Sequence, residues 1–441
     1  MDWNETIRKT IVSGILLGGA SQSTSETGFF DPDTSRRMRV LGTVQSYFPF
    51  QERGGPVFKV RSLARGLVNR GHEITVLTAD LGFRSRNGAD PGVSHSPWGW
   101  RSRGDGVETI YLSTFARYRS LTINPAVIGF SRTSLKRFDV VHFFGLYDLL
   151  GPAVSYFCRR QGIPYVLEPM GMYRPIVRNL ELKRLYHRIL GSPMVKGARF
   201  LVATSEQERG ELIDGGIDSS RVVVRRNGID GPEALPPRGE FRKKWDIAAE
   251  SKVVLFLGRL VSKKSPDLLL QAFANWRSKS SLGQNSVLVI AGPDERDGFA
   301  SRLKEIASRL GLGRSALFVG PLYDEEKWQA YRDADVFVLP SQNENFGNTA
   351  AESAVCGTPV IVTNRCGIAP LVGAAGLVIP HDALELERAL GRVLEDADFH
   401  RFCRKGCLPM ADALSWEAPL DETERLYRLC LSDQPLQEAL A

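Results

Sequence analysis

The sequence lacks any apolar run of the roughly 20 residues that a membrane-spanning helix requires. Its nearest approach, residues 11–20, is shorter and follows a basic pair, as the apolar segment of a signal peptide would. Asp2 and Glu5, and the absence of an Ala-x-Ala cleavage pattern, argue against a signal peptide. We therefore expect residues 1–37 to form a tail and linker, with shallow membrane contact as the second interpretation and cleavage as the third.

Cysteine is scarce, and the six cysteines include no Cys-x-x-Cys pair. Thiols scattered in this way are typical of a reduced, cytoplasmic protein rather than of a disulfide framework or a metal site. The six histidines form no ligand-spaced cluster. Asp333 and Asp335 resemble a metal-binding pair, but they directly precede a buried strand, where a structural role is typical. We expect neither a metal ion nor another cofactor.

The composition is that of an ordinary globular enzyme, with 43% hydrophobic and 24% charged residues. A chain of 441 residues exceeds a single core and predicts two domains of roughly 150–200 residues each. The net charge of +7 favours anionic partners such as phosphates, anionic lipid surfaces or nucleic acid. No basic motif with interleaved aromatic residues is present, so nucleic acid is not expected among the partners.

Apolar strand segments alternate with helical segments in two successive sets. The first set of expected strands is 38–44, 73–78, 109–112, 140–144, 164–168, 199–203 and 222–225, and the second is 253–257, 286–291, 316–319, 336–339, 359–362 and 377–379. Strand–helix–strand units form right-handed crossovers of parallel sheets. The sequence therefore predicts an α/β fold of two Rossmann-like, doubly wound domains that face a central cleft.

Three prolines between positions 232 and 237 indicate the boundary between the two sets. We expect an amino-terminal domain at 38–230 and a carboxy-terminal domain at 231–416. Residues 81–106, which are rich in Gly, Ser and Arg, predict a mobile loop.

The segment from Pro340 to Glu352 is the most informative part of the chain. An apolar strand is followed by a polar loop and a helix of small residues, so unpaired N–H groups and the positive end of the helix dipole suit a phosphate or pyrophosphate. Glu344 and Glu352, eight positions apart, cannot also bind phosphate and are suited to hydroxyl groups. Diphosphate beside polyhydroxyl describes a nucleotide sugar. The expected donor contacts in this segment are Glu352, Phe346, Gly347, Asn348 and Thr349.

A structural interpretation of the same residues is a capping box, in which the sequence Thr349-Ala-Ala-Glu352 satisfies N–H groups at the start of a helix. The two interpretations of Glu352 do not exclude each other.

Arg259 and Lys264 follow the strand at 253–257, in a loop that ends at a Ser-Pro helix start. Two fixed cations stabilise the negative charge that develops on a departing nucleoside diphosphate, so a metal ion is unnecessary. Gly55, after the first strand, is a further candidate because glycine lets the backbone approach a phosphate closely.

The motif Pro340-Ser341, Glu344, Phe346-Gly347, Glu352 and residues 357–361 resembles the signature of the retaining GT-B glycosyltransferases of family 4. The resemblance extends from about Arg39 to Leu431.

This resemblance implies that Glu344 lies beside the donor sugar and that Glu352 binds the ribose. It implies that Arg259 and Lys264 contact the leaving diphosphate, as the Arg and Lys of the family do at the same spacing. It also implies same-face substitution, with Glu344 in a positioning and electrostatic role. The resemblance assigns the acceptor side to the domain at 38–230 and nucleotide-sugar binding to the domain at 231–416, and it implies a final helix at about 417–441 that returns to the first domain.

Two positions differ from the family pattern. Many members carry Pro-His-Gly where this chain has Pro169-Met170-Gly171, so Met170 stands in place of a histidine that reaches the donor sugar. His142, at the end of another strand, is the alternative histidine, although a structural role is more usual there. Residues 364–370 also differ from the Gly-Gly and acid of many members. These differences affect the identity of the donor and acceptor rather than the class of reaction.

The resemblance implies a glycan or lipid-linked glycan as the acceptor. A basic and amphipathic stretch at 174–199 suits either an anionic membrane or an ordinary surface helix with its apolar side in the core. We expect a cytoplasmic protein, peripheral on the inner membrane face under the first of these interpretations. A sugar phosphorylase, a nucleotide-sugar epimerase and a non-catalytic nucleotide-sugar binder are the alternative functions.

Overall fold

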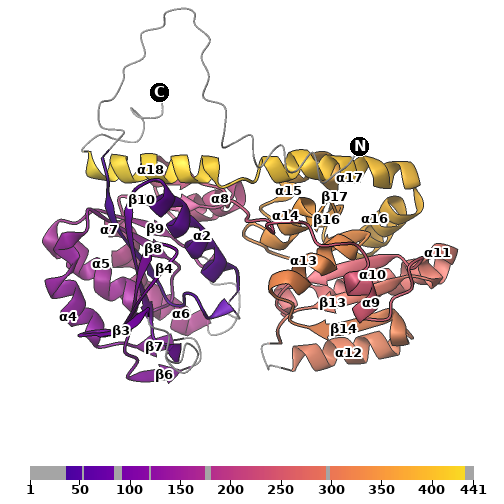
Figure 1. Cartoon of the computed structure of the whole chain (residues 1–441), viewed down its shortest axis with the longest axis horizontal. Coiled ribbons are helices and arrows are strands. Elements are labelled where there is room, and N and C mark those ends of the chain that lie inside the picture. Colours follow the sequence, from indigo (N-terminus) through magenta and orange to yellow (C-terminus); the bar gives the residue numbers. More distant parts are fainter. Residues whose placement is uncertain are drawn as a thin grey trace, which may run out of the picture.

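The computed structural model describes residues 36–51, 54–83, 92–118, 121–173, 180–294 and 298–432. Two α/β domains lie side by side, and helices α17 (Ala397–Asp412) and α18 (Glu417–Leu431) run along one side of both (Figure 1). The strands expected from apolar runs agree with the structure to within two residues at each end.

The first domain is built on a nine-stranded sheet in the order β11-β10-β9-β8-β1-β2-β5-β4-β3. Its strands are β1 (Arg39–Val44), β2 (Glu73–Ala79), β3 (Val93–Ser96), β4 (Gly99–Gly104), β5 (Val107–Leu112), β8 (Val140–Phe144), β9 (Tyr165–Glu168), β10 (Phe200–Ala203) and β11 (Val222–Val224). The central strand β1 pairs in parallel with β2 and β8.

The prediction of a mobile loop over residues 81–106 is wrong for its second half. Strands β3 and β4 form an antiparallel extension of the sheet next to β5, while residues 84–91 lie outside the described residues. Strand β3 is the edge strand and β4 lies next to it, and most of their residues are at least partly exposed, so polar residues and glycine are tolerated there. A composition typical of loops therefore concealed two strands.

Short connections place the helices of the first domain around this sheet. They are α2 (Gly55–Asn69), α4 (Ala126–Thr133), α5 (Leu150–Gln161), α6 (Leu180–Tyr186), α7 (Ser192–Gly197) and α8 (Glu206–Asp214), with a π-helical turn at His187–Gly191 and 3-10 turns at Leu135–Arg137 and Ser219–Arg221. A separate antiparallel pair is formed by β6 (Ala116–Tyr118) and β7 (Leu121–Ile123).

The second domain is built on a parallel six-stranded sheet in the order β14-β13-β12-β15-β16-β17. Its strands are β12 (Val253–Leu257), β13 (Val287–Ala291), β14 (Ala316–Gly320), β15 (Val336–Leu339), β16 (Val360–Thr363) and β17 (Gly376–Ile379). Every residue of β12 and β15 is buried, as expected of central strands covered on both faces.

The helices of the second domain cover both faces of this sheet. They are α9 (Glu240–Lys244), α10 (Pro266–Lys279), α11 (Ser281–Gln284), α12 (Phe299–Arg309), α13 (Asp324–Asp333), α14 (Asn348–Val355), α15 (Ala369–Val372), α16 (Ala383–Glu395) and α17, with 3-10 turns at η5 (Ser262–Lys264), Gly313–Ser315 and Gly373–Ala375.

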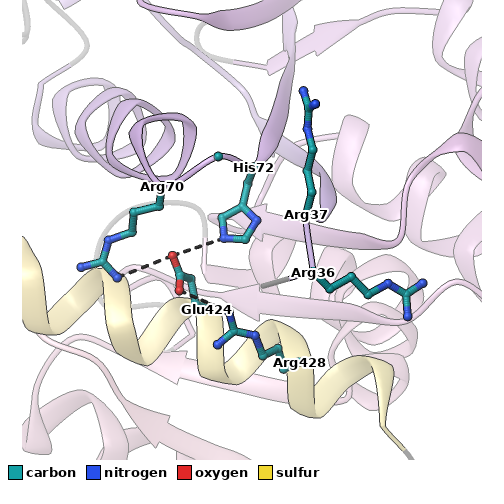
Figure 2. A pocket seen from close by; sticks show the side chains of 7 residues that line it. Arg36, Arg37, Arg70, His72, Glu424 and Arg428 are labelled. Carbon is teal, nitrogen blue, oxygen red and sulfur yellow. Dashed lines mark ion pairs between the residues drawn. The ribbon is translucent and has the colours of Figure 1, made fainter. Parts of the chain in front are cut away.

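Helix α18 returns to the first domain, where it packs against α2, β8 and β9. Contacts of Glu424 with Arg70 and His72 join it to the turn between α2 and β2 (Figure 2). The Nδ1 atom of His72 accepts a hydrogen bond from the amide of Met38, and its Nε2 atom lies 3.2 Å from Glu424. Arg70 contacts both Glu424 and Glu417. These contacts fix the last helix to a domain that is remote in sequence.

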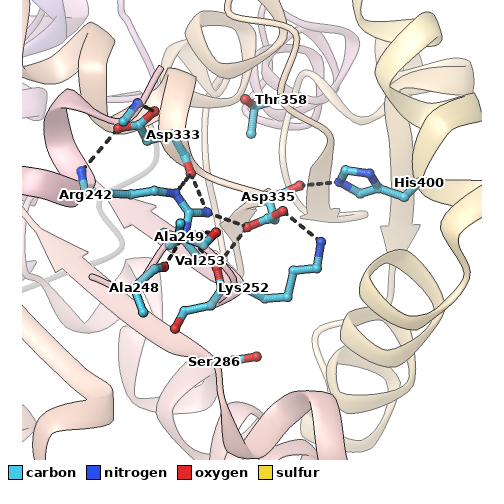
Figure 3. Close-up of polar contacts among 12 residues, drawn as sticks. Arg242, Ala248, Ala249, Lys252, Val253, Ser286, Asp333, Asp335, Thr358 and His400 are labelled. Atoms are coloured by element: carbon cyan, nitrogen blue, oxygen red, sulfur yellow. Dashed lines mark hydrogen bonds and ion pairs between the residues drawn. The ribbon is translucent and has the colours of Figure 1, made fainter. Parts of the chain in front are cut away.

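The acidic pair before β15 has the structural role that we expected (Figure 3). The carboxylate of Asp333 accepts hydrogen bonds from the amides of Gly239, Phe241 and Arg242 at the start of α9. The carboxylate of Asp335 accepts from the Arg242 guanidinium and the Val253 amide, both at 2.9 Å. The pair thus joins α9 to the start of β12.

Asp148, in the loop after β8, is a buried carboxyl group with a testable effect on stability. Burial raises its pKa to about 6, although it accepts a hydrogen bond of 2.6 Å from the amide of Gly151. The native state therefore retains a proton that the unfolded state has released between about pH 4 and 6, so stability should fall as the pH rises through this window.

In wild type, Asp148 should lower the free energy of unfolding by roughly 2–3 kcal/mol as the pH rises through this window, because one pKa unit corresponds to about 1.4 kcal/mol. The Asp148→Asn variant should lack this contribution. Urea unfolding of both proteins between pH 4 and 7 measures the difference. Equal pH slopes for the two proteins would contradict the prediction.

Candidate active site

Two loops meet beyond the carboxyl ends of the neighbouring strands β12 and β15. The amide of Gln342 in the second loop donates to the carbonyl of Lys263 in the first at 2.8 Å. Lys264 Nζ lies 2.8 Å from Glu344 Oε2, and both side chains are largely buried. The structure therefore brings together residues that are 80 positions apart in the sequence.

Glu344 is held by backbone as well as by charge. Its amide donates to the carbonyl of Arg365 and its carbonyl accepts from the amide of Gly367, so the loop is paired with the turn after β16. Burial by itself would raise the pKa of Glu344, but Lys264, Lys263 and Arg259 outweigh it and lower the pKa below its ordinary value. Glu344 is therefore an ionised carboxylate at neutral pH.

Helix α14 begins immediately after this loop, at a glycine. Gly347 has a φ of 114°, and a Cβ atom there would lie 2.9 Å from Ile368 Cγ2, so both conformation and space require glycine. Asn348 and Thr349 form the first turn, which no side chain of the described residues caps. The Thr349 hydroxyl is buried and has no hydrogen-bond partner among the described residues. This helix start therefore offers donors to a ligand.

The prediction that Phe346 contacts the donor needs a correction. Its side chain is 3% exposed and belongs to the core of the second domain, packed with residues such as Leu339 and Ile368. The ring therefore anchors the Glu344 loop to the core by packing, and it has almost no exposed surface that could contact a donor sugar.

Glu352 lies one turn into α14 and accepts two hydrogen bonds from α13, from Lys327 Nζ and the Tyr331 hydroxyl, each at 2.9 Å. The capping-box interpretation is wrong, because the helix begins at Asn348 and the carboxylate of Glu352 bonds to these side chains. Burial, reinforced by Glu352, raises the pKa of Tyr331, so the phenol is a neutral donor. Sequence reasoning missed Lys327 and Tyr331, whose spacing of four residues is common on any helix.

The start of α2 in the first domain faces the start of α14. A Cβ atom on Gly55 would lie 3.5 Å from the side-chain nitrogen Nδ2 of Asn348, and the side-chain oxygen of Asn348 accepts a hydrogen bond from Asn227 at 3.1 Å. Helix α2 likewise has no side-chain cap among the described residues. Gly55 is thus placed beside the first turn of α14, with two helix starts close together.

Met170 lies in the turn after β9, with a φ of 53°. Its side chain approaches Gly145, in the loop after β8. The neighbouring Gly171 is packed against Asn345 of the second domain, so this turn borders the loop that carries Glu344.

The suggestion that His142 reaches the sugar or the acceptor also needs a correction. It is fully buried, its Nδ1 lies 2.8 Å from the Tyr427 hydroxyl of α18, and its Nε2 lies 3.6 Å from Glu168. It has no exposed surface with which to contact an acceptor or a sugar. Burial, with Arg225 and Lys59 nearby, lowers the pKa of His142 well below its usual range, so the ring is neutral.

The partners of His142 form a buried charge cluster that sequence reasoning missed. Glu168, at the end of β9, accepts hydrogen bonds from Lys59 of α2 and from Arg225 after β11, and all three side chains are almost fully buried. Lys59 lies 109 residues from Glu168 in the sequence, and no local pattern singles it out. The cluster joins α2 to the end of β9 and to the segment after β11.

Within the described residues, no helix is long and apolar enough to cross a membrane. In the same part of the chain, no group of three or more His, Cys, Asp or Glu side chains is arranged to hold a metal ion.

Two α/β domains built on largely parallel sheets have the architecture of the GT-B fold, and the Lys264–Glu344 pair lies at the strand ends of the second domain. A family model described as glycosyl transferases group 1 matches residues 237–406, and one described as glycosyl transferase 4-like domain matches residues 54–228. The chain belongs to the group 1 glycosyltransferases of family 4.

Relatives in sequence include the D-inositol 3-phosphate glycosyltransferase of Streptosporangium roseum, which is 33% identical over 305 residues, or 66% of this chain and 69% of that protein. The enzyme of the same name from Salinispora tropica is 31% identical over 255 residues, which cover 54% of this chain and 53% of the Salinispora protein. The chain thus spans only about half the length of this relative.

Among solved structures, Anabaena Alr3699/HepE in complex with UDP-glucose has a TM-score of 0.69 and 17% sequence identity, and the match covers 89% of this chain and 100% of the other. A similarity at this level of identity establishes the shared fold alone.

Proposed function

We propose that the protein is a retaining, metal-independent glycosyltransferase that moves a sugar from a nucleoside diphosphate to a glycan or lipid-linked glycan acceptor. The observation that carries this proposal is the Lys264–Glu344 pair at the uncapped start of α14, with Arg259 in the same loop as Lys264. Cations for a diphosphate and a carboxylate for sugar hydroxyls lie within one small region.

In the proposed reaction, the bond between the anomeric carbon and the phosphate oxygen breaks, and its electron pair leaves with the diphosphate. The acceptor hydroxyl oxygen bonds to the same face of the anomeric carbon, and its proton passes to the departing phosphate oxygen. Arg259, Lys264 and the N–H groups of α14 stabilise the leaving group as its charge develops. These cations supply the charge that a metal ion would otherwise provide, which supports metal independence.

Glu344 is assigned a positioning and electrostatic role. Its lowered pKa and its contact of 2.8 Å with Lys264 make it an ionised hydrogen-bond acceptor for sugar hydroxyls and a poor nucleophile. Glu352 is assigned to the ribose hydroxyls, because its carboxylate retains acceptor capacity beside its bonds to Lys327 and Tyr331.

The acceptor is expected on the first-domain side, near Gly55 and Met170. The relatives named D-inositol 3-phosphate glycosyltransferase add a phosphorylated polyol to the acceptors worth testing beside glycans.

The experiment is a turnover assay with UDP-, GDP- and ADP-sugars in EDTA, with inositol 3-phosphate and oligosaccharides as acceptors and the product anomer assigned by NMR. Transfer or slow hydrolysis of one donor, with retention at the anomeric carbon, is the expected result. Inversion would overturn the retaining assignment, and a strict metal requirement would overturn metal independence. Loss of both transfer and hydrolysis with every donor would favour a binding protein or a phosphorylase.

We also propose peripheral contact with an anionic membrane through the helical stretch of α6 and the π-helical turn. Leu182, Leu185 and Ile189 are 61%, 53% and 58% exposed, and their spacing places them on one face of the helix. These exposures argue against the interpretation in which the apolar side lies in the core. Exposed basic residues at 184 and 188 flank the apolar face, as in helices that lie on anionic bilayers. Arg174 and Arg178 of the same basic stretch lie outside the described residues.

Changing Leu182, Leu185 and Ile189 to serine should weaken flotation with phosphatidylglycerol vesicles by more than about tenfold, because each side chain loses on the order of 1 kcal/mol of apolar burial. The matched control changes Leu384 and Phe402, exposed apolar residues of the second domain, to serine. Equal binding of the triple variant and wild type, or equal wild-type binding to neutral and anionic vesicles, would contradict the proposal.

A further inference from the structure

The loop that carries Glu344 also contacts the first domain. The side-chain amide of Asn345 donates to the hydroxyl of Thr204, just after β10, at 2.6 Å. A second and longer contact, of 3.3 Å, joins Asn343 to Glu211 of α8. The residue next to the central carboxylate is therefore hydrogen-bonded across the interface between the domains.

Thr204 is presented to Asn345 by a buried carboxylate. Glu208 Oε2 accepts from the Thr204 amide at 2.8 Å and from the Thr204 hydroxyl at 2.9 Å. Because the hydroxyl has one proton and gives it to Glu208, its lone pairs are left for the Asn345 amide. Thr204 and Glu208 are 0% and 1% exposed, so this polarity is fixed within the fold.

The Glu208 carboxylate also binds the turn after β9, which packs against Asn345. Glu208 Oε1 accepts from the amide of Gly171, and a Cβ atom on Gly171 would lie 3.0 Å from the Cβ of Asn345. A Cβ atom on Gly367 would lie 2.1 Å from the carbonyl oxygen of Asn345 and 2.7 Å from the Cβ of Ser205. Two glycines thus allow the backbones of both domains to close around Asn345.

We propose that Asn345 is a positioning residue: its hydrogen bond to Thr204 holds the two domains together and thereby fixes the orientation of the Glu344 carboxylate. Glu344 is tied to Lys264 and to the turn after β16 within the second domain. Asn345 adds the tie to the first domain, where the acceptor is expected. The role of Glu344 in transfer rests on the function proposed above, whereas the contact between the domains does not.

The test uses two changes at Thr204 and two changes at Asn345. Thr204→Ser keeps the hydroxyl and Thr204→Val removes it. Asn345→Ala removes the donor, and Asn345→Asp turns an oxygen toward the lone pairs of Thr204. Gln342→Ala is the matched control, because this exposed side chain is on the same loop and only its backbone makes the contact to Lys263.

We expect Thr204→Val, Asn345→Ala and Asn345→Asp to lower kcat by about tenfold or more with a smaller change in the donor KM. The ratio of donor hydrolysis to transfer should rise, since a less tightly closed site admits water. Thr204→Ser and Gln342→Ala should remain within about threefold of wild type. Combining Asn345→Ala with Thr204→Val should add little to either single change, because both remove one interaction.

Small-angle X-ray scattering without substrate provides a readout that does not need activity. A larger radius of gyration in Asn345→Ala and Thr204→Val than in wild type, at unchanged melting temperature, supports the contact between the domains even if no donor is turned over. If wild type is active, kcat within threefold of wild type in both variants overturns the proposal. If wild type is inactive, the function proposed above fails, and identical scattering overturns the contact.

Discussion

Replacing Lys264 by methionine is expected to lower kcat/KM for the nucleotide sugar by about 10²- to 10³-fold, the usual effect of removing one group that stabilises developing charge. In the proposed reaction, Lys264 meets the negative charge of the departing diphosphate. Methionine preserves most of the length and apolar contact of the side chain, including its packing over Gly258. The loss should therefore report on charge rather than on shape.

The same change should also alter Glu344. Lys264 is the largest of the cationic influences that lower the pKa of Glu344 against the effect of burial, so this pKa should rise in the variant. Lys263→Met is the neighbouring control, because the backbone contact to Gln342 remains, and its loss should stay below about tenfold. Initial rates of donor turnover give both values. Similar effects in the two variants would show that overall positive charge, and not the placement of Lys264, matters.

Replacing Glu168 by glutamine is expected to lower the free energy of unfolding by about 3–5 kcal/mol, the range observed when one partner of a buried ion pair is removed. Lys59 and Arg225 would be left in the interior beside a neutral amide. Burial, with Arg225 nearby, lowers the pKa of Lys59 well below its usual range even with Glu168 present. Urea unfolding of the full chain, followed by a probe in the first domain, measures the loss.

A compensating variant separates the charge effect from the loss of packing. Changing Lys59 to methionine together with Glu168 to glutamine removes one of the uncompensated cations, so the double variant should regain part of the lost stability. A double variant that is less stable than Glu168→Gln would contradict the interpretation of the cluster as mutually dependent charges.

The site residues that could be predicted from the sequence share one property: each lies within a short segment whose pattern is local. Arg259 and Lys264 follow a buried strand directly, and Glu344 and Glu352 belong to one strand–loop–helix unit. The topology of a parallel sheet then places these two segments next to each other, because β12 and β15 are neighbours.

The residues that could not be predicted depend on contacts between distant segments. Asn345 and Thr204 are 141 positions apart, and Lys59 and Glu168 are 109 apart. His142 was misassigned because a strand-end histidine has the same sequence context whether it faces a cleft or a packed helix. Here α18, which comes nearly 300 residues later, covers it with Tyr427.

Strands were located accurately where long apolar runs are buried on both faces. They were missed at β3, the edge strand of the first sheet, and at its neighbour β4, since solvation there removes the hydrophobic signal.

The most direct measurement is calorimetric titration of UDP, GDP and ADP into wild type and into Glu352→Gln, in EDTA. The proposed site predicts that one nucleoside diphosphate binds wild type without metal and binds the variant at least about tenfold more weakly, because one ribose contact to a carboxylate is lost. Failure of all three nucleotides to bind wild type would contradict a donor site at the start of α14. Equal binding to both proteins would contradict the placement of the ribose at Glu352.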